Sequence, residues 1–389
     1  MKISADPQKV EEILIRGVEE VVDKKNLEKK LKSGQQLRVK FGIDPTSPDI
    51  HLGRAVPLLK LRDFQRFGHK IILIIGDFTG LVGDTSDKDS ERPMLTTVQV
   101  KQNMKTYVQQ AGKIIDVKKC EIHYNSEWLG KLDYREIGRQ ADFFSLNEFI
   151  SRENIKKRLE AGKRISLREL LYPLMQGYDS VVVKADVEIG GTDQRFNLLA
   201  GREMQRHFNQ APQDIITNRL IEGLDGRKMS SSWGNVIKIT DSPNEQFGKI
   251  MSLKDELVPN YFELCTRVSL NEIEGMSARE VKIKLARAIV AIYHGEKAAL
   301  LAEGEFNRVF KEKKPPSDMP EITVREKQIN ILDLLVKLKM APSKTEARRL
   351  VEQGGVEIAG EIQKDWRRIV NLEKGEVVRV GKRKFTKIV

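Results

Sequence analysis

A run of consecutive apolar residues limits the folds that are open to this chain. The stretch KIILIIGDF, residues 70–78, is apolar almost throughout and long enough for only one strand. Such a strand is typical of a parallel sheet whose two faces are both covered by helices. A short strand pattern at 37–44 and a helical pattern at 54–68 precede it. Because this alternation continues from Leu37 to Leu224, we expect a doubly wound α/β sheet with ligands at the carboxyl ends of its strands.

Hydrophobic periodicity predicts the further elements of this part of the chain. We expect a helix over residues 98–112, which ends in a glycine, and a strand over 120–128. A longer apolar strand is expected over 180–191, followed by a second helix over 194–208. The first 22 residues have a polar start and an amphipathic helical pattern, so we expect no secretory signal there.

The last third of the chain shows a different pattern. After about Ile239 helical stretches replace the strands, and the charged, proline-rich residues 311–321 are typical of a linker. Beyond them, Ser343 and Glu346 have the spacing of a capping box for a helix over 344–353. Two short alternating stretches follow, so we expect a small α+β unit with a basic helix and basic strands.

Composition narrows the class of protein. With 389 residues, of which 40% are apolar and 32% charged, the chain has the mixture of a globular protein. No apolar run is long enough to span a membrane, and Cys120 and Cys265 match no metal site or disulfide framework. We therefore expect a protein of the reducing cytoplasm. The net charge is +12, half of it in residues 329–389, which fits a polyanionic partner or an ordinary lysine-rich surface equally well.

The stretch PTSPDIHLGR, residues 45–54, contains a candidate phosphate site. Gly53 lets a ligand approach the backbone, and the helix that follows offers free N–H groups and the positive end of its dipole. His51 can donate a hydrogen bond to a phosphate oxygen, while Thr46 can add a hydroxyl group and Arg54 a fixed charge. The alternative is a solvent-exposed histidine at a helix start, which is the better interpretation of the triplet alone.

A second candidate lies in LDGRKMSSSWGN, residues 224–235, where a turn and three serines discourage regular structure. Lys228 on this loop can close over a triphosphate and place its ammonium group on the charge that develops as pyrophosphate leaves. The alternative is a serine-rich surface turn.

Together, HLGR before the first helix of the sheet and KMSSS after its last strand resemble the HIGH and KMSKS signatures of the class I aminoacyl-tRNA synthetases. Arg54 departs from the last histidine of the first signature, and Ser231 departs from the second lysine of the other. Residues 76–93, 170–180 and 189–197 resemble the tyrosyl-tRNA synthetases in particular. The basic tail is similar to the S4-type RNA-binding domain of bacterial tyrosyl enzymes.

The resemblance implies a role for each matching residue. The ammonium group of L-tyrosine is expected at Asp84, Tyr172 and Gln176, the phenol hydroxyl at Asp179, and the carboxylate at Gln194. The spacing of Tyr172, Gln176 and Asp179 puts them on one helix face, which otherwise would be interpreted as a half-buried face. ATP is expected at His51, Gly53, Arg54, Gly191, Asp193, Lys228 and Ser231, with the ribose at Gly191 and Asp193. The catalytic groups around the triphosphate are Thr46, His51, Lys88, Arg92 and Lys228. RNA is expected at Lys344, Arg348 and Arg349.

The implied reaction is the ATP-dependent attachment of L-tyrosine to tRNA(Tyr) through tyrosyl-adenylate. Mg²⁺ is expected to arrive with ATP, without a dedicated protein site, and the family is usually a homodimer. We expect a Rossmann-like catalytic domain over 1–238, an α-helical anticodon-side domain with linker over 239–320, and an S4-like RNA-binding domain over 321–389.

Three alternatives and one departure stay open. Lys40 occupies the place where many tyrosyl enzymes have a tyrosine for the phenol hydroxyl, so the partner of Asp179 is undetermined. A tryptophanyl-tRNA synthetase shares the fold, but Asp179 and the tail argue against it. A small-molecule nucleotidyltransferase leaves the basic tail and the KMSSS loop unexplained. A non-catalytic RNA-binding protein would bind RNA without activating an amino acid.

Overall fold

The computed structural model describes residues 3–85, 94–317, 319–381 and 384–389. The chain divides into two compact units, Met1–Leu300 and Leu301–Val389. In the described parts of the chain, no helix is both long enough and apolar enough to cross a membrane.

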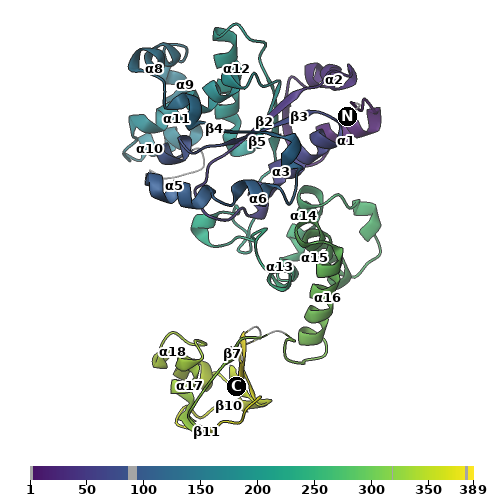
Figure 1. Ribbon diagram of the computed structural model, residues 1–389, viewed down its shortest axis with the longest axis vertical. Helices are drawn as coiled ribbons and strands as arrows, with labels where there is room; N and C mark the ends of the chain where they lie inside the picture. The colour runs from purple at the N-terminus through teal and green to yellow at the C-terminus, as the bar shows by residue number, and fades with distance from the viewer. Residues whose placement is uncertain (1–2, 86–93, 318, 382–383) are drawn as a thin grey trace. The chain divides into compact units, whose positions relative to one another are not determined.

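A six-stranded sheet forms the centre of the larger unit (Figure 1). Its strands are β1 (Val18–Val22), β2 (Arg38–Ile43), β3 (Lys70–Ile75), β4 (Glu121–Tyr124), β5 (Val187–Gly191) and β6 (Asp214–Asn218), in the spatial order β1-β6-β5-β2-β3-β4. Strands β2 to β6 are parallel, while β1 pairs antiparallel with β6 at the edge. Successive residues of β3 from Ile71 to Ile75 are at most 1% exposed, so both faces of this strand are covered. The predicted parallel α/β sheet is confirmed. The helical pattern expected over the first 22 residues is wrong at its end, where β1 forms an edge strand.

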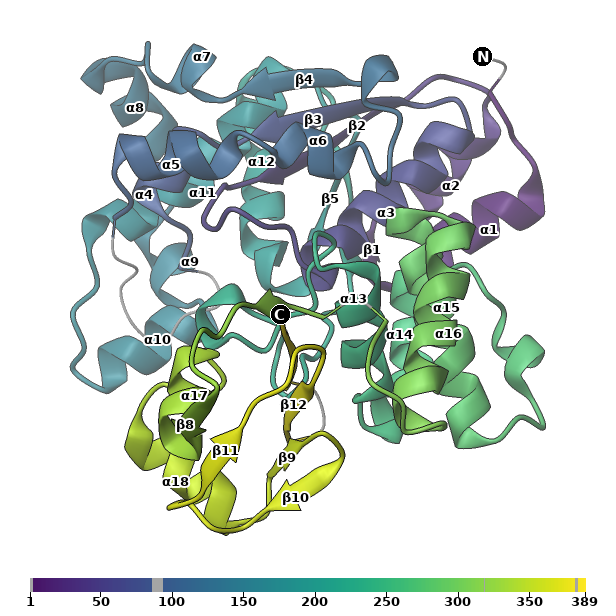
Figure 2. The ribbon, with the colours of Figure 1, turned by 60° about the horizontal axis from the view of Figure 1, so that its bottom comes forward.

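Helices connect these strands. They are α1 (Pro7–Ile15), α2 (Lys24–Lys32), α3 (Leu52–Arg66), α4 (Thr79–Val82), α5 (Thr97–Met104), α6 (Tyr107–Ala111), α7 (Ser126–Leu129), α8 (Tyr134–Ala141), α9 (Leu146–Ile150), α10 (Glu153–Glu160), α11 (Leu167–Val182) and α12 (Arg195–His207). Helix α3 packs on β2, β3 and β5, whereas α12 packs on β5, β6 and α11. Helices α8 to α11 lie together at one side of this unit in both ribbon views (Figures 1 and 2).

The helix expected over residues 98–112 is interrupted between α5 and α6. The interruption lets two side chains of α6 bind the loop before α3. Tyr107 Oη donates to the carbonyl oxygen of Ser47 at 2.6 Å, and Gln110 Nε2 donates to that of Pro48 at 2.8 Å. These long-range bonds override the local helical pattern, which continues across the break.

The strand expected over residues 180–191 is shorter than predicted. Helix α11 extends to Val182, and Lys184 then adopts a left-handed conformation with φ of 49° before β5 begins. Val181 and Val183 are buried in the helical segment as they would be in a strand. Apolar character alone therefore could not separate the two conformations.

After β6 the larger unit continues in helices, as predicted. These are α13 (Pro243–Met251), α14 (Val258–Cys265), α15 (Ala278–His294) and α16 (Glu296–Phe310), the last of which extends into the smaller unit.

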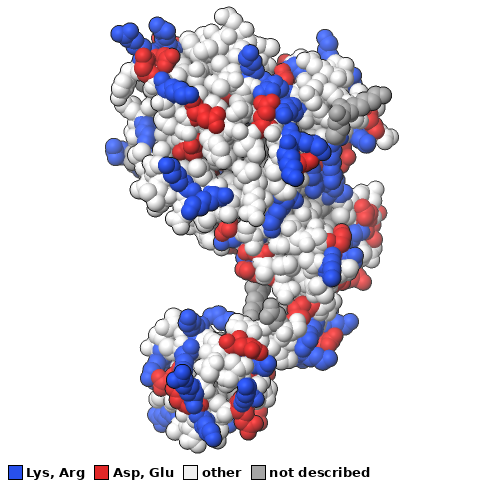
Figure 3. All heavy atoms as spheres, in the orientation of Figure 1, with Lys and Arg blue, Asp and Glu red and all other residues white. Residues whose placement is uncertain are grey.

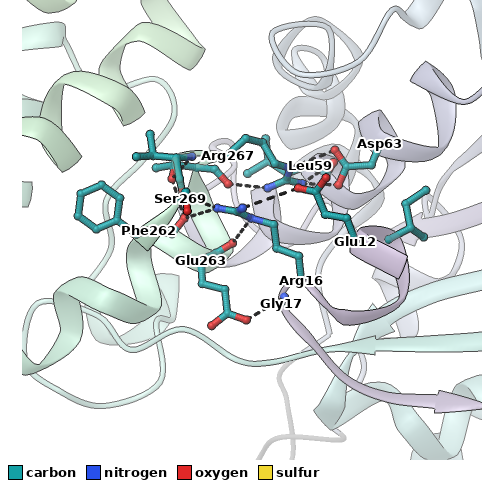
Figure 4. A network of polar contacts seen from close by, with 12 residues as sticks. Glu12, Arg16, Gly17, Leu59, Asp63, Phe262, Glu263, Arg267 and Ser269 are labelled. Carbon is teal, nitrogen blue, oxygen red and sulfur yellow. Dashed lines mark hydrogen bonds and ion pairs between the residues drawn. The ribbon is translucent and has the colours of Figure 1, made fainter. Parts of the chain in front are cut away.

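A polar network fixes α14 and the segment after it to the amino-terminal helix and to α3 (Figure 4). The Arg16 guanidinium donates to the carbonyl oxygens of Phe262 and Glu263 at 3.3 and 3.2 Å. Arg267 forms an ion pair with Asp63 of α3 at 2.6 Å. Because His51 is the N-cap residue of α3, this network also anchors the helix whose amino end was predicted to bind phosphate.

The smaller unit is an α+β structure, as predicted. Its elements are β7 (Glu321–Ile322), β8 (Gln328–Asn330), α17 (Ile331–Lys337), α18 (Lys344–Glu352), β9 (Val356–Ile358), β10 (Glu361–Gln363), β11 (Ile369–Asn371), β12 (Val377–Val380) and β13 (Lys384–Ile388). Ser343 caps α18 by accepting a hydrogen bond from the Glu346 N–H at 3.3 Å. The Glu346 carboxylate turns to Arg349 instead, at 2.5 Å, so only half of the predicted capping box forms.

Arg267→Met should lower the free energy of unfolding of the larger unit by about 2 kcal/mol, because it removes the bidentate partner of the largely buried Asp63 carboxylate. Urea unfolding measures the change. Lys32→Met is the matched control, since it removes an exposed pair with Glu28 and should have no measurable effect. Equal stability of the two variants would contradict a stabilising role for the network.

Candidate active site

A cavity of about 670 Å³ opens at the carboxyl ends of β2 and β5. The two strands pair through Val39–Val187 and Lys40–Glu188, and within these described strands the pairing ends at the second of these pairs. Beyond it, residues 41–43 and 189–191 line the cavity. The strand order also reverses here, since β3 follows β2 on one side and β6 follows β5 on the other. Doubly wound sheets bind ligands at such a reversal.

The cavity brings together most of the residues that the sequence indicated. Those that line it are Thr46, His51, Gly53, Arg54, Asp84, Tyr172, Gln176, Asp179, Gly191, Asp193, Gln194, Lys228 and Ser231. Lys88 and Arg92 lie outside the described residues. Lys344, Arg348 and Arg349 belong to the smaller unit.

His51 stands at the N-cap position of α3 and is buried, so the alternative of an exposed surface histidine is excluded. Burial, followed by the nearby charges of Arg54 and Lys228, lowers the pKa of its imidazole to about 3, which keeps the ring neutral at pH 7. Its Nδ1 has no hydrogen-bond partner among the described residues. A Cβ atom on Gly53 would lie 3.1 Å from the ring, so glycine makes room for the imidazole.

Arg54, the departure from the HIGH pattern, fastens the loop that precedes α3. Its guanidinium donates to Tyr107 Oη at 2.9 Å, to the Asp44 carbonyl oxygen at 3.2 Å, and to Thr46 Oγ1. Thr46 is thus held at the cavity wall by the arginine. Tyr107 lies on α6, so the break in the predicted helix contributes to this arrangement.

The loop that carries Lys228 lies against the start of α3. Met229 Sδ accepts a hydrogen bond from the Gly53 N–H at 3.3 Å, and the Ser231 and Ser47 hydroxyl groups are 3.3 Å apart. Lys228 Nζ lies 2.7 Å from Asp193 Oδ2. The lysine and His51 therefore face one cavity, which excludes an unconnected surface turn.

Asp179 lines the cavity and is buried, at 4% exposed. Trp128 Nε1 donates to its Oδ1 at 2.8 Å, and Asn125 Nδ2 to its Oδ2 at 3.3 Å. Burial raises the pKa of the carboxyl group to about 7, against the opposing effects of Lys40, Trp128 and Asn125. Whether it is protonated or ionised, a buried carboxyl group can form a hydrogen bond with a hydroxyl group of a ligand.

Tyr172 is held by a chain of hydrogen bonds at the cavity wall. Its hydroxyl group donates to Asp44 Oδ2 at 2.9 Å, and Thr79 Oγ1 donates to the other oxygen at 2.7 Å. A Cβ atom on Gly76 would lie 2.0 Å from Asp44 Oδ1, so only glycine fits there. Burial and Asp44 keep the pKa of the Tyr172 phenol well above its usual value, so the group stays protonated.

Gln194 and Asp84, from different segments, meet at the same wall, with Gln194 Nε2 2.5 Å from Asp84 Oδ2.

Three residues of the site were not predicted from the sequence, namely Asp44, Asn125 and Trp128. A signal for the first two was present, because Asp44 follows β2 and Asn125 follows β4 directly, at the edge where ligands of such sheets bind.

Lys40 does not take the place of a hydroxyl-binding tyrosine beside Asp179. It is fully buried below the cavity, and its Nζ lies 2.9 Å from Glu188 Oε1. Trp128 and Asn125 are the hydrogen-bond partners of Asp179 instead.

The cations predicted on α18 are exposed, and each has a carboxylate neighbour. The pairs are Lys344–Asp333, Arg348–Glu352 and Arg349–Glu346, at 2.5, 2.8 and 2.5 Å. Arg348 also lies over the Trp366 ring, 4.4 Å from its centroid. On the face that Figure 3 shows, basic and acidic side chains of the smaller unit are interspersed, so this surface is not a uniform positive patch.

Two family descriptions cover almost all of the chain. Residues 32–311 match tRNA synthetases class I (W and Y), and residues 311–388 match the tyrosine–tRNA ligase SYY-like C-terminal domain.

Curated relatives and solved structures agree with these matches. The chain is 46% identical to the tyrosine–tRNA ligase of Moorella thermoacetica, over 97% of this chain and 94% of the relative. It is 44% identical to that of Thermotoga maritima, over 98% of each. A truncated mitochondrial tyrosyl-tRNA synthetase of Aspergillus nidulans has the same fold, with a TM-score of 0.66 at 21% identity over 78% of this chain and 94% of that one. The Archaeoglobus fulgidus enzyme complexed with L-tyrosine gives 0.61 at 22% identity, over 76% and 99%.

The raised pKa of Asp179 predicts a pH dependence of stability. From about pH 4 to pH 7 the unfolded chain ionises this carboxyl group while the folded chain does not, so the folded state loses relative stability as pH rises. Asp179→Asn removes this loss. We expect the stability of the wild type relative to the variant to fall by roughly 2 kcal/mol or more between pH 5 and pH 8 in urea unfolding. A difference that stays constant over this interval would disprove the assignment.

Proposed function

Since the chain belongs to the class I tRNA synthetases and, within them, to the tyrosine–tRNA ligases, we propose that the cavity at the β2–β5 reversal binds both L-tyrosine and ATP. The reaction of this family is the ATP-dependent attachment of L-tyrosine to tRNA. The single observation that carries the proposal is that His51, Lys228 and Asp179 line one cavity.

L-Tyrosine would bind with its phenol ring in the deep part of the cavity. Asp179, oriented by Trp128 and Asn125, would accept a hydrogen bond from the phenol hydroxyl. Phenylalanine would leave this carboxyl group without that partner, and a buried polar group without a partner is costly.

Acceptors for the ammonium group of L-tyrosine lie along one wall. They are the Asp84 carboxylate, the Gln176 side-chain oxygen and the Tyr172 hydroxyl oxygen, which keeps a free lone pair because its proton is directed to Asp44. Gln194, which touches Asp84, would address the carboxylate of the substrate.

ATP would occupy the end of the cavity near α3, with its triphosphate between Thr46, His51 and Lys228. Gly53, Arg54 and Ser231 would contact the nucleotide, and Gly191 and Asp193 would contact its ribose. Lys228 lies on Asp193 in the structure, so a triphosphate that attracts the lysine would release Asp193 for the ribose hydroxyl groups. Lys88 and Arg92 are proposed from the sequence pattern as further phosphate contacts.

In the first step, an oxygen of the L-tyrosine carboxylate would bond to the α-phosphorus while the bond from that phosphorus to pyrophosphate breaks. The carboxylate is ionised at pH 7, so no side chain has to remove a proton from it. The protein would contribute positioning and charge stabilisation. Neutral His51 would donate a hydrogen bond from its ring N–H to a phosphate oxygen. Lys228 would neutralise charge on the departing pyrophosphate. In the second step, the adenylate would pass its acyl group to the terminal ribose of tRNA(Tyr) and release AMP.

Mg²⁺ would accompany the triphosphate. Among the described residues, no group of three or more His, Cys, Asp or Glu side chains is arranged to hold a metal ion. The ion would be coordinated by phosphate oxygens, and its contribution would be to neutralise their charge.

Three segments of the chain would have different functions. Residues 1–238 would carry the chemistry, residues 239–320 would lie on the anticodon side of tRNA, and residues 321–389 would bind RNA through Lys344, Arg348 and Arg349. Arg348 and its neighbour Trp366 support an RNA-binding role, since nucleic-acid bases stack on aromatic rings and interact with arginine guanidinium groups. The cytoplasm is the proposed compartment.

His51→Ala and Lys228→Ala should each slow tyrosine-dependent pyrophosphate exchange by roughly a hundredfold or more, because each removes a donor that acts on developing charge. L-Tyrosine affinity should change little. Lys238→Ala is the control, since this lysine pairs with Asp49 at 2.7 Å and does not line the cavity. If exchange is unchanged in the first two variants, the cavity is not the activation site.

A homodimer is supported by apolar side chains on the helices at one side of the larger unit. The most exposed of them are Tyr134, Leu146, Leu159 and Leu167, at 94%, 61%, 49% and 78%. Apolar side chains concentrated in this way mark an interaction surface. Leu167 begins α11, which also carries Tyr172, Gln176 and Asp179, so association and substrate binding would share a helix.

Leu167→Asp should convert the dimer to a monomer in sedimentation velocity, because association would bury the new charge. An acidic residue in the first turn of a helix is compatible with the fold of α11. Leu270→Asp is the control, since Leu270 is 43% exposed on another part of the unit. Retention of the dimer by the Leu167 variant would refute this interface.

A further inference from the structure

The buried pair Lys40–Glu188 lies at the last rung between β2 and β5, directly below the cavity. Lys40 is 0% exposed and Glu188 is 1% exposed. The lysine ammonium group lies 2.9 Å from Glu188 Oε1, 2.7 Å from Ser180 Oγ and 2.9 Å from the Gln176 carbonyl oxygen. These contacts use all three of its donors, so Lys40 has none to offer a ligand.

The Glu188 carboxylate is equally well satisfied. Lys40 and Gln176 Nε2 contact its Oε1, the latter at 3.1 Å. Ser180 Oγ and Gln213 Nε2 contact its Oε2. An ionised carboxylate has acceptors and no donor, so it can face only the NH₂ side of the Gln176 amide.

This restriction fixes which end of the Gln176 amide is available to a ligand. The side chain lines the cavity, and its nitrogen is directed to Glu188. Its oxygen is consequently the atom left for another partner. An ammonium group carries only donors and needs such an oxygen.

We propose that Glu188, with Lys40 as its counter-charge, is a positioning residue that orients the Gln176 amide so that its oxygen faces the ammonium group of L-tyrosine. The inference rests on the proposed contact between Gln176 and that ammonium group. A neutral partner could bind either end of the amide and would leave the two orientations close in energy. A charged partner removes one of them, and Lys40 compensates the charge that would otherwise be costly to bury.

The test uses two ligands that differ in the ammonium group. Tyramine has the phenol and the ammonium group, whereas 3-(4-hydroxyphenyl)propionate has the phenol and the carboxylate but no ammonium group. Both are measured as competitive inhibitors of tyrosine-dependent pyrophosphate exchange by the full-length protein, alongside the KM values for L-tyrosine and ATP.

In Glu188→Gln we expect the KM for L-tyrosine and the inhibition constant of tyramine to rise about tenfold, because the amide can now turn its nitrogen to the ammonium group. The inhibition constant of 3-(4-hydroxyphenyl)propionate and the KM for ATP should stay unchanged. The double variant Lys40→Met, Glu188→Gln leaves no unpaired buried charge and should show the same selectivity, even if the single variant does not fold.

Glu121→Gln is the matched control, because Glu121 pairs with Arg38 of the same strand β2 at 2.7 Å and does not line the cavity. It should change none of the four constants. An equal loss for both inhibitors in the double variant, or no loss for either, would overturn the inference.

Gln176→Met separates this failure from failure of the underlying assignment. If Gln176→Met leaves tyramine inhibition unchanged, Gln176 does not contact the ammonium group and both proposals fall. If Gln176→Met weakens tyramine while the Glu188 variants do not, the assignment of Gln176 stands and only the orienting role of Glu188 is wrong.

Discussion

The early end of the pairing between β2 and β5 is the constraint on which the rest of the structure depends. Parallel strands normally continue their hydrogen bonds along their shared length, but here they stop after Lys40–Glu188. The remaining residues of β2 and β5 keep their pairing with β3 and β6, and they line the cavity. The Lys40–Glu188 ion pair lies at the last rung. Residues of α3, which follows β2, and of α11, which precedes β5, line the opening.

The cavity contains two kinds of groups, which suit the two substrates that we propose for it. Carboxyl groups of Asp44, Asp84 and Asp179 line the part in which we propose that L-tyrosine binds. Neutral His51 and the Lys228 ammonium group, which pairs with Asp193, line the part that we propose for ATP. Trp128 and Asn125 donate hydrogen bonds to Asp179, and Tyr107 accepts one from Arg54, so residues outside the predicted motifs support the site.

Much of this site could be predicted because its motifs are short and local in sequence. Residues of the stretches around His51, Tyr172 and Lys228 line one cavity. The residues that support the site were harder to predict. Trp128, for example, contributes to the site through its hydrogen bond to Asp179, about fifty residues away in the chain. The break between α5 and α6 was missed for the same reason, because long-range bonds to the loop before α3 cause it.

The sequence by itself determined the alternation of strands and helices, the parallel sheet and the identity of the family, because apolar periodicity and short motifs are properties of neighbouring residues. Only the tertiary structure decided the contacts of Lys40 and Arg54, two of the three departures from the family pattern. Lys40 is held by Glu188 and Arg54 by Tyr107, which lie far away in the chain. Contacts between distant segments depend on how the sheet brings them together, and no local pattern records them.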